Sequence, residues 1–257
     1  RNLRDHDMPE MDHSASQGSP RTRTAPVRTD MAGAGSRAVR ALVPMAADGV
    51  GPSQTCIMLA GGMDEAGGDV EIMVNRRRGK PERPRILTAA PGPLKHLPHG
   101  WIAGPATRAI EAWYLRRLKD GDIAWLWPAA SLRTHEIVAK RGNPIVLEGI
   151  NSRMGLAKEI LDAANDAFGA APTHGITEAR IAEEHDKIAL ASTMFAPSAG
   201  VEEGLVGTKL EDVFLKSSYG VDTSQSQRAR SRPEPRGEDP VIYMFCGYAC
   251  VRKGAHH

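Results

Sequence analysis

The sequence predicts a doubly wound α/β domain with a mostly parallel sheet. Short apolar segments of strand type alternate along the chain with longer segments whose apolar residues recur at helical spacing. The links between these segments are short. This alternation covers residues 37–222 and is typical of a parallel sheet covered by helices on both faces.

Six apolar segments are predicted as strands. They are AVRALVPM (38–45), DVEIMVN (69–75), RILTAA (85–90), IAWLWPA (123–129), PIVLEGI (144–150) and TMFAPS (193–198). The segments between them are predicted as helices over 55–68, 106–120, 131–142, 153–168 and 176–192. The second of these places Ile110, Trp113, Tyr114 and Leu118 on one face, and Gly121 ends it. Ser198 is expected to cap one more short helix, which carries Glu202 in its first turn.

The segments outside this domain have a different composition. Residues 1–36 are polar and charged without an apolar period, which predicts a disordered tail. Residues 223–239 are polar and proline-rich and are expected to form a linker. Residues 240–257 then have the pattern of a strand followed by a turn, as if a second domain began there and were truncated after its first strand.

Composition limits the class of protein. The 257 residues are 41% apolar and 25% charged, and a formal net charge of +2 indicates no nucleic-acid partner. No apolar run reaches the ~18 residues of a membrane-spanning helix, and the charged N-terminus does not have the pattern of a secretory signal. Three cysteines are too few for a disulfide framework. We therefore expect a cytoplasmic protein.

Two loops are candidates for binding phosphate. The first follows the opening strand, where Gly49 and Gly51 let the backbone approach a ligand and the next helix offers free N–H groups. A dinucleotide fingerprint would need a third small residue where Gln54 stands, so the two glycines either contact phosphate or only turn the chain. In the second loop, Arg252 and Lys253 precede a glycine, and they are either phosphate ligands or a solvated surface pair.

Four stretches in order resemble retaining glycosyltransferases of the two-domain GT-B fold, the large group that includes sucrose and glycogen synthases. They are DGVGPSQTCIMLAGGMDEAGGDVEIMV, EEHDKIALASTMFAPSAGVEEGLVG, LKSSYGVDT and CGYACVRKGAHH, and together they span about residues 40–257. The resemblance implies an acceptor-side domain followed by the start of a nucleotide-sugar donor domain. It also implies that Gly49 and Gly51 approach the donor phosphates from one side and that Lys253, helped by Arg252, binds them from the other.

The chain departs from the family pattern at several positions. Tyr248 stands where many members have a phosphate-reading Arg, and Asn151 stands nearest to a position where many have His, so no catalytic residue is assigned. Ser192 replaces an Asp that ends a helix in the family. The family's acidic pair, E-x-seven-E, belongs to the donor domain and has no counterpart here. We expect the chain as given to be catalytically inactive.

Three residues at predicted strand ends are candidates for the acceptor cleft. Trp127 is either a sugar platform or a buried core aromatic, while Glu148 and Asn151 either bind sugar hydroxyls or cap a loop. The expected acceptor is a carbohydrate or a lipid-linked molecule. His135 is expected to be a surface or interface residue, and His185 in the charged turn EEHDK is expected to be solvated.

A basic loop and the cysteine spacing bear on membrane, cofactor and metal partners. Arg76, Arg77 and Arg78 begin a basic loop that is either solvated or contacts anionic lipid, and in the second case the protein is peripheral to the inner face of a membrane. Neither a cofactor nor a metal is expected, because Cys246, Cys250 and the final histidines are poorly spaced for zinc. Two alternatives stay open: a Rossmann-type nucleotide-cofactor protein and a non-catalytic module that binds a partner or membrane.

Overall fold

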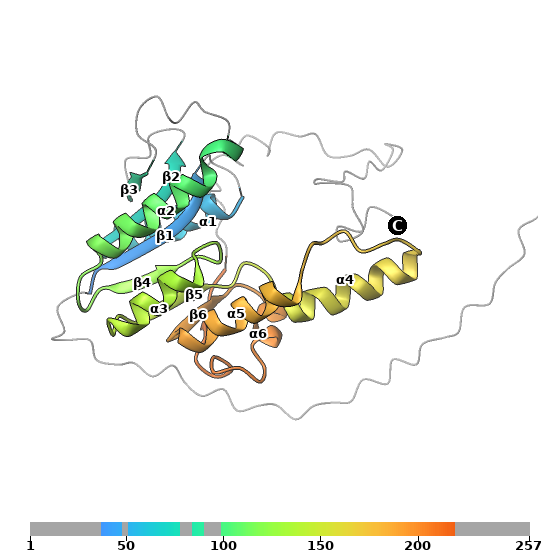
Figure 1. The fold of residues 1–257 in the computed structure, drawn as a ribbon. Coiled ribbons are helices and arrows are strands. Elements are labelled where there is room, and N and C mark those ends of the chain that lie inside the picture. Colours follow the sequence, from blue (N-terminus) through green and yellow to red (C-terminus); the bar gives the residue numbers. More distant parts are fainter. Residues whose placement is uncertain (1–36, 48–50, 78–83, 90–98, 219–257) are drawn as a thin grey trace, which may run out of the picture. The chain divides into compact units, whose positions relative to one another are not determined.

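The described part of the chain folds around one sheet of seven parallel strands. The computed structural model describes residues 37–47, 51–77, 84–89 and 99–218. The strands are β1 (Val39–Ala47), β2 (Val70–Arg77), β3 (Arg85–Thr88), β4 (Ile123–Leu126), β5 (Ile145–Glu148), β6 (Thr193–Ala196) and β7 (Leu215–Lys216). Their order in the sheet is β3-β2-β1-β4-β5-β6-β7, and every neighbouring pair is parallel (Figure 1). The predicted α/β fold class is therefore confirmed.

In the described part of the chain, six helices connect these strands. They are α1 (Gly51–Glu65), α2 (His99–Arg117), α3 (Leu132–Lys140), α4 (Met154–Phe168), α5 (Glu178–Leu190) and α6 (Ala199–Gly204). All six predicted strands and the predicted helices occur, with ends shifted by up to four residues, except that α2 begins seven residues before its predicted start. The prediction missed β7, whose two residues are too few and too exposed to give a sequence signal.

Helices cover the sheet through two apolar clusters. One cluster joins Leu42, Ile110, Tyr114, Val138 and Ile188, and so packs α2, α3 and α5 on one face of the sheet. The other joins α1 to the opposite face through Cys56 and Ala60, together with Trp125 and Trp127. The strand side chains alternate between these clusters, as expected for a sheet that is buried on both faces.

Ion pairs lie at the amino-terminal edge of the sheet, near the starts of β1 and β2. The Glu71 carboxylate is 2% exposed and lies between the guanidinium groups of Arg117 and Arg85. Arg40 donates two hydrogen bonds of 2.9 Å to Asp69 and lies 3.6 Å from Asp122. These charges are therefore neutralised within the fold itself.

Ser198 lies at the N-cap of α6 as predicted, and Glu202 lies in the first turn. The Ser198 carbonyl accepts hydrogen bonds from the backbone N–H groups of Val201 and Glu202, but its side chain makes no capping bond. The predicted tail, linker and second-domain segment lie outside the described residues. No helix in the described part of the chain is long and apolar enough to span a bilayer.

Candidate functional site

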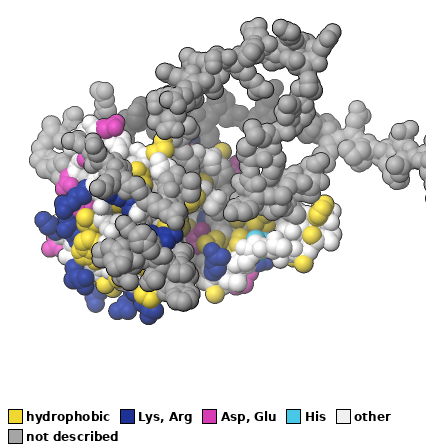
Figure 2. Space-filling view, turned by 90° about the horizontal axis from the view of Figure 1, so that it is seen from above, with side chains coloured by type: hydrophobic (Ala, Val, Ile, Leu, Met, Phe, Trp, Pro, Cys, Tyr) yellow, Lys and Arg dark blue, Asp and Glu magenta, His cyan; other side chains and the backbone are white. Residues whose placement is uncertain are grey.

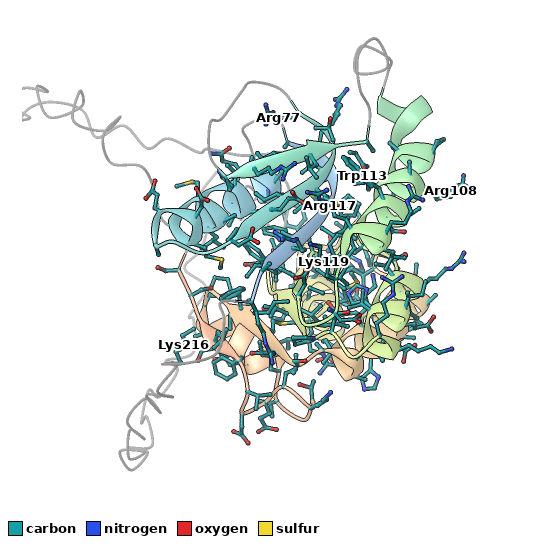
Figure 3. The ribbon with its side chains drawn as sticks, turned by 90° about the vertical axis from the view of Figure 1, so that its left-hand side faces the viewer. Arg77, Arg108, Trp113, Arg117, Lys119 and Lys216 are labelled. Carbon is teal, nitrogen blue, oxygen red and sulfur yellow. The ribbon has the colours of Figure 1, made fainter. Side chains whose placement is uncertain are left out.

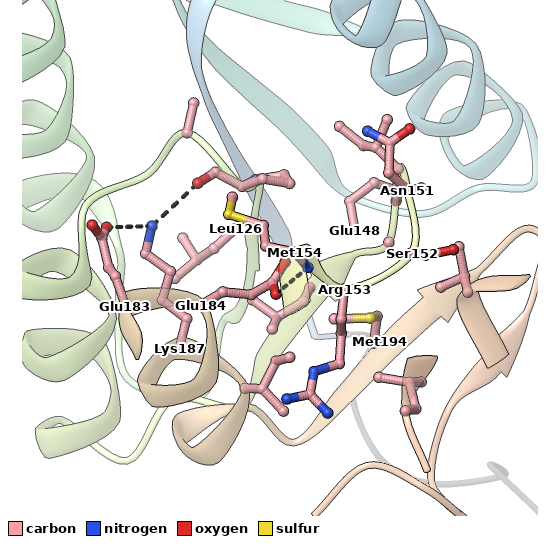
Figure 4. Close-up of a pocket in the computed structure, with 18 of the residues that line it drawn as sticks. Leu126, Glu148, Asn151, Ser152, Arg153, Met154, Glu183, Glu184, Lys187 and Met194 are labelled. Carbon is pink, nitrogen blue, oxygen red and sulfur yellow. Dashed lines mark hydrogen bonds and ion pairs between the residues drawn. The ribbon is translucent and has the colours of Figure 1, made fainter. Parts of the chain in front are cut away.

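A cavity of about 450 Å³ opens at the carboxyl ends of β4 and β5 (Figure 4). Its walls come from the residues that follow these strands, from the start of α4 and from one face of α5. Representative lining residues are Leu126, Glu148, Asn151, Met154, Glu184 and Lys187. In doubly wound sheets ligands bind at this edge, and the volume is that of an ordinary small-molecule pocket. The position and size make the cavity the candidate site.

A glycine brings the wall of the cavity close to the sheet. Gly149 follows β5, and its N–H donates a 2.9 Å hydrogen bond to the carbonyl of Phe195 on β6. A Cβ atom at this position would lie 2.7 Å from that carbonyl oxygen and 2.7 Å from a methyl group of Val201. Only glycine fits without displacement, so it fixes the path of the loop that carries Asn151.

Charged side chains of α5 form one wall. Lys187 Nζ lies 2.7 Å from the Glu183 carboxylate and donates a 3.2 Å hydrogen bond to the carbonyl of Pro128, which ties α5 to the end of β4 (Figure 4). The hydrogen bond from Lys187 lowers the pKa of Glu183. This wall therefore holds a fixed ammonium and a fixed carboxylate.

Glu184, a residue of α5, has its side chain at the start of α4. Its carboxylate accepts a 2.7 Å hydrogen bond from the backbone N–H of Met154, at the positive end of that helix. Burial raises the pKa of Glu184, against the opposing effect of this bond and of nearby Arg153. The helix end is thus already supplied with an anion from the chain itself.

His135 lies on α3 with no exposed surface, so of the two predicted placements, surface or interface, the surface placement is wrong. Its Nδ1 lies 2.8 Å from the carbonyl oxygen of Ser131, which only accepts, so the proton is on Nδ1. Its Nε2 is buried and has no hydrogen-bond partner among the described residues. Burial lowers the pKa of His135 to about 4, and the neutral ring contributes to the cavity wall.

Two of the predicted cleft residues come together in the cavity. Glu148, at the end of β5, is 2% exposed, and Asn151 is exposed at the cavity wall. Burial raises the pKa of the Cys56 thiol on α1, and the Glu148 carboxylate raises it further.

Trp127 lies elsewhere. It is fully buried in the core cluster of α1, and its ring centroid is 5.8 Å from that of Trp125. Its neighbours Leu126 and Pro128 line the cavity, whereas Trp127 does not. Of the two alternatives, a sugar platform or a buried core aromatic, the structure shows the core aromatic.

The predicted phosphate-binding residues are described only in part. Gly51 begins α1 with a φ of +65°, a conformation that favours glycine. Gly49, Arg252, Lys253 and Arg78 lie outside the described residues, so their roles stay predictions. Arg76 and Arg77 end β2 and pair with the end of β1. Among the residues that the structure describes, no group of three His, Cys, Asp or Glu side chains could hold a metal ion.

Asn75 lies at the end of β2, where a dinucleotide-binding protein would carry an acidic residue for the ribose. Its side-chain amide donates 2.9 Å hydrogen bonds to the carbonyl of Pro44 and to the hydroxyl of Thr107. The side chain is buried and is used to hold β1, β2 and α2 together. This position therefore does not favour the cofactor-binding alternative.

The cavity residues of α5 were not predicted. The turn EEHDK has the composition of a solvated helix face, and His185 is indeed 63% exposed. Glu183, Glu184 and Lys187 nevertheless line the cavity, because the helix turns them toward the ends of β4 and β5. Their spacing of three and four residues is the one sequence signal that they share a face.

Comparison with known proteins gives similarities of structure alone. No family model matches the chain, and no curated protein matches it. Sucrose-phosphate synthase (tll1590) from Thermosynechococcus elongatus is similar over 77% of this chain and 53% of its own, with 13% identity and a TM-score of 0.48. Anabaena Alr3699/HepE, solved in complex with UDP and glucose, is similar over 72% of this chain and 46% of its own, with 10% identity and a TM-score of 0.36. The chain spans about half the length of each.

Proposed function

We propose that the chain is the acceptor-side domain of a retaining glycosyltransferase that uses a nucleotide-sugar donor. The observation that carries this proposal is the cavity at the carboxyl ends of β4 and β5, on the same edge of the sheet as the N-terminus of α1, which begins at Gly51. The order and spacing of the sequence motifs that resemble the GT-B family support it independently.

The cavity wall suits a polyhydroxyl ligand. Carboxylates of Glu148 and Glu183 can accept hydrogen bonds from hydroxyl groups, and the Asn151 amide can donate and accept. Leu126 and Met194 add apolar wall against which the C–H faces of a sugar ring can pack. Carbohydrate and lipid-linked acceptors both present such hydroxyls.

The donor phosphates would lie next to Gly49 and Gly51. In the reaction, a bond forms between the anomeric carbon of the donor sugar and an acceptor hydroxyl oxygen, the bond from that carbon to the diphosphate oxygen breaks, and the hydroxyl proton passes to the departing diphosphate. The departing diphosphate gains negative charge, so N–H groups near Gly49 and Gly51 and the cations Arg252 and Lys253 would lower the barrier. No residue of this chain is assigned the catalytic step.

Transfer of labelled sugar tests the proposal. The assay uses the chain, and the longest open reading frame that contains it, with UDP-, GDP- and ADP-linked sugars and a panel of sugar, polyol and lipid acceptors. We expect retained-anomer product from the longer protein and loss of product in the cavity-filling variant Asn151→Trp. Glu136→Trp, at an exposed α3 position that does not line the cavity, is the matched control. Failure of every donor to transfer sugar would contradict the proposal.

A further inference from the structure

Formal charges balance in the described wall of the cavity. The lining side chains that carry a formal charge are Glu148, Glu183, Glu184, Arg153, Arg180 and Lys187. Three are carboxylates and three are cations, and His135 is neutral because burial lowers its pKa to about 4. These residues therefore present no net charge to a ligand.

The cations of this wall are engaged within the fold. Lys187 Nζ lies 2.7 Å from the Glu183 carboxylate. The guanidinium groups of Arg180 and Arg153 each donate to a backbone carbonyl, at 3.1 and 3.4 Å. An anionic ligand would have to compete for these groups. A hydroxyl group can instead donate to the carboxylates and accept from remaining N–H donors without separating the pairs.

The N-terminus of α4 is the part of the wall that would best hold an anion. The first N–H groups of a helix have no partner within the helix and lie at its positive end. Here the Met154 N–H donates its 2.7 Å bond to Glu184. Burial opposes the ionised form of Glu184, and the charges of Arg153, Lys187 and Arg180 favour it. The carboxylate of the chain thus lies where an anionic group of a ligand would otherwise bind.

We propose that Glu184 makes the cavity select an uncharged polyhydroxyl ligand and exclude its phosphorylated or carboxylated counterparts. A phosphate at this helix end would have to displace the Glu184 carboxylate or lie beside it, with Glu148 and Glu183 in the same wall. Like charges placed against a competing ligand are a means of specificity. The inference rests on the proposed function for the polyhydroxyl class, and it assigns Glu184 no step of the transfer.

Removal of the carboxylate tests this role, with inorganic phosphate as the probe. In Glu184→Ala the Met154 N–H loses its acceptor, and the formal charge of the lining residues becomes +1. The chain has ten methionines, so labelling them with ¹⁵N gives a simple amide spectrum, in which Met154→Leu identifies the reporter resonance. We expect phosphate to shift this resonance in Glu184→Ala with an affinity roughly tenfold or more above that of the parent, the effect of one charge-assisted hydrogen bond.

The reporter has to be local because cations elsewhere also attract phosphate. Figure 2 shows dark blue Lys and Arg side chains on the outer surface with magenta Asp and Glu among them. Figure 3 labels Arg108, Lys119 and Lys216, and none of these three lines the cavity. The matched control is Glu159→Ala, which removes an exposed carboxylate from the second turn of α4, outside the cavity lining. It should respond to phosphate like the parent.

Paired ligands extend the test to the proposed ligand class. Glucose is compared with glucose 6-phosphate, and glycerol with glycerol 3-phosphate, through the same resonance. The parent should bind the uncharged member of a pair more tightly, and Glu184→Ala should favour the phosphorylated member. Glu184→Gln keeps an acceptor for the Met154 N–H but removes the charge. It should also gain affinity for phosphate over the parent, and it decides the question if Glu184→Ala fails to fold in melting experiments.

Three results would overturn the inference. They are binding of phosphate to the parent as tight as to the Glu184 variants, an equal gain in Glu159→Ala, and tighter binding of the phosphorylated member of a pair by the parent. Failure of every sugar and polyol to bind would contradict the proposed function instead. The comparison with inorganic phosphate would then still decide the role of Glu184.

Discussion

Acidification should destabilise the fold through His135. The ring has no exposed surface, Nδ1 donates to the carbonyl of Ser131, and Nε2 has no acceptor among the described residues. Protonation would place a cation in that position. The pKa of His135 is accordingly lowered by burial from 6.5 to about 4 in the folded chain.

The direction and size follow from linkage between protonation and folding. Because the folded pKa lies below the unfolded one, the unfolded chain binds the proton first as pH falls. The contribution of the neutral His135 ring to the free energy of unfolding is therefore fully present above pH 6.5 and decreases on acidification until about pH 4. Between pH 7 and pH 5 the loss from this one group is about 2 kcal/mol, and the full loss below pH 4 is about 3 kcal/mol.

Urea unfolding at pH 7, 6 and 5 measures this loss. The variant His135→Asn keeps an N–H donor for the Ser131 carbonyl but cannot titrate, so its free energy of unfolding should fall by about 2 kcal/mol less than that of the parent over this range. His185→Asn, which removes an exposed imidazole, should follow the parent. A constant difference between the parent and His135→Asn from pH 7 to pH 5 would refute the reasoning.

Three further changes test the packing. Arg117→Leu should cost about 3 kcal/mol because it leaves the buried Glu71 carboxylate short of a partner, and adding Glu71→Leu should recover most of that, as urea unfolding of both variants would show. Gly149→Ala should lower the free energy of unfolding by about 1–3 kcal/mol through overpacking, whereas Gly62→Ala, where a Cβ meets no atom within 4 Å, should raise it by about 0.5–1 kcal/mol. Equal effects of the two alanines would contradict the account of the loop. Tyr114→Phe removes a 3.0 Å hydrogen bond from a buried hydroxyl to the carbonyl of Arg40, and a melting shift equivalent to about 1 kcal/mol is expected. An unchanged melting temperature would show that this bond contributes nothing.

The fold could be predicted from the sequence because its signals are local. Alternation of apolar segments and helical spacing depend on neighbouring residues, and both predicted the sheet and its helices. The short β7 was missed since a two-residue strand exists only through its pairing with β6. The order of the strands also required the structure, because pairing is not encoded within any one segment.

The site could be predicted only where it lies at a strand end. Glu148 ends an apolar strand and Asn151 follows it, so their position at the carboxyl edge could be predicted. His135 and the α5 wall were not, because burial of a polar helix residue depends on what packs against that helix. Trp127 illustrates the converse: its neighbours Leu126 and Pro128 line the cavity, while it belongs to the core.

Sugar binding by the cavity is the most direct test of the central claim. Saturation-transfer NMR on the full chain, with a panel of monosaccharides, polyols and their phosphates, measures it without any donor. The account predicts transfer to at least one such compound, lost in Asn151→Trp and kept in Glu136→Trp. Binding that survives Asn151→Trp, or no binding by any member of the panel, would contradict it.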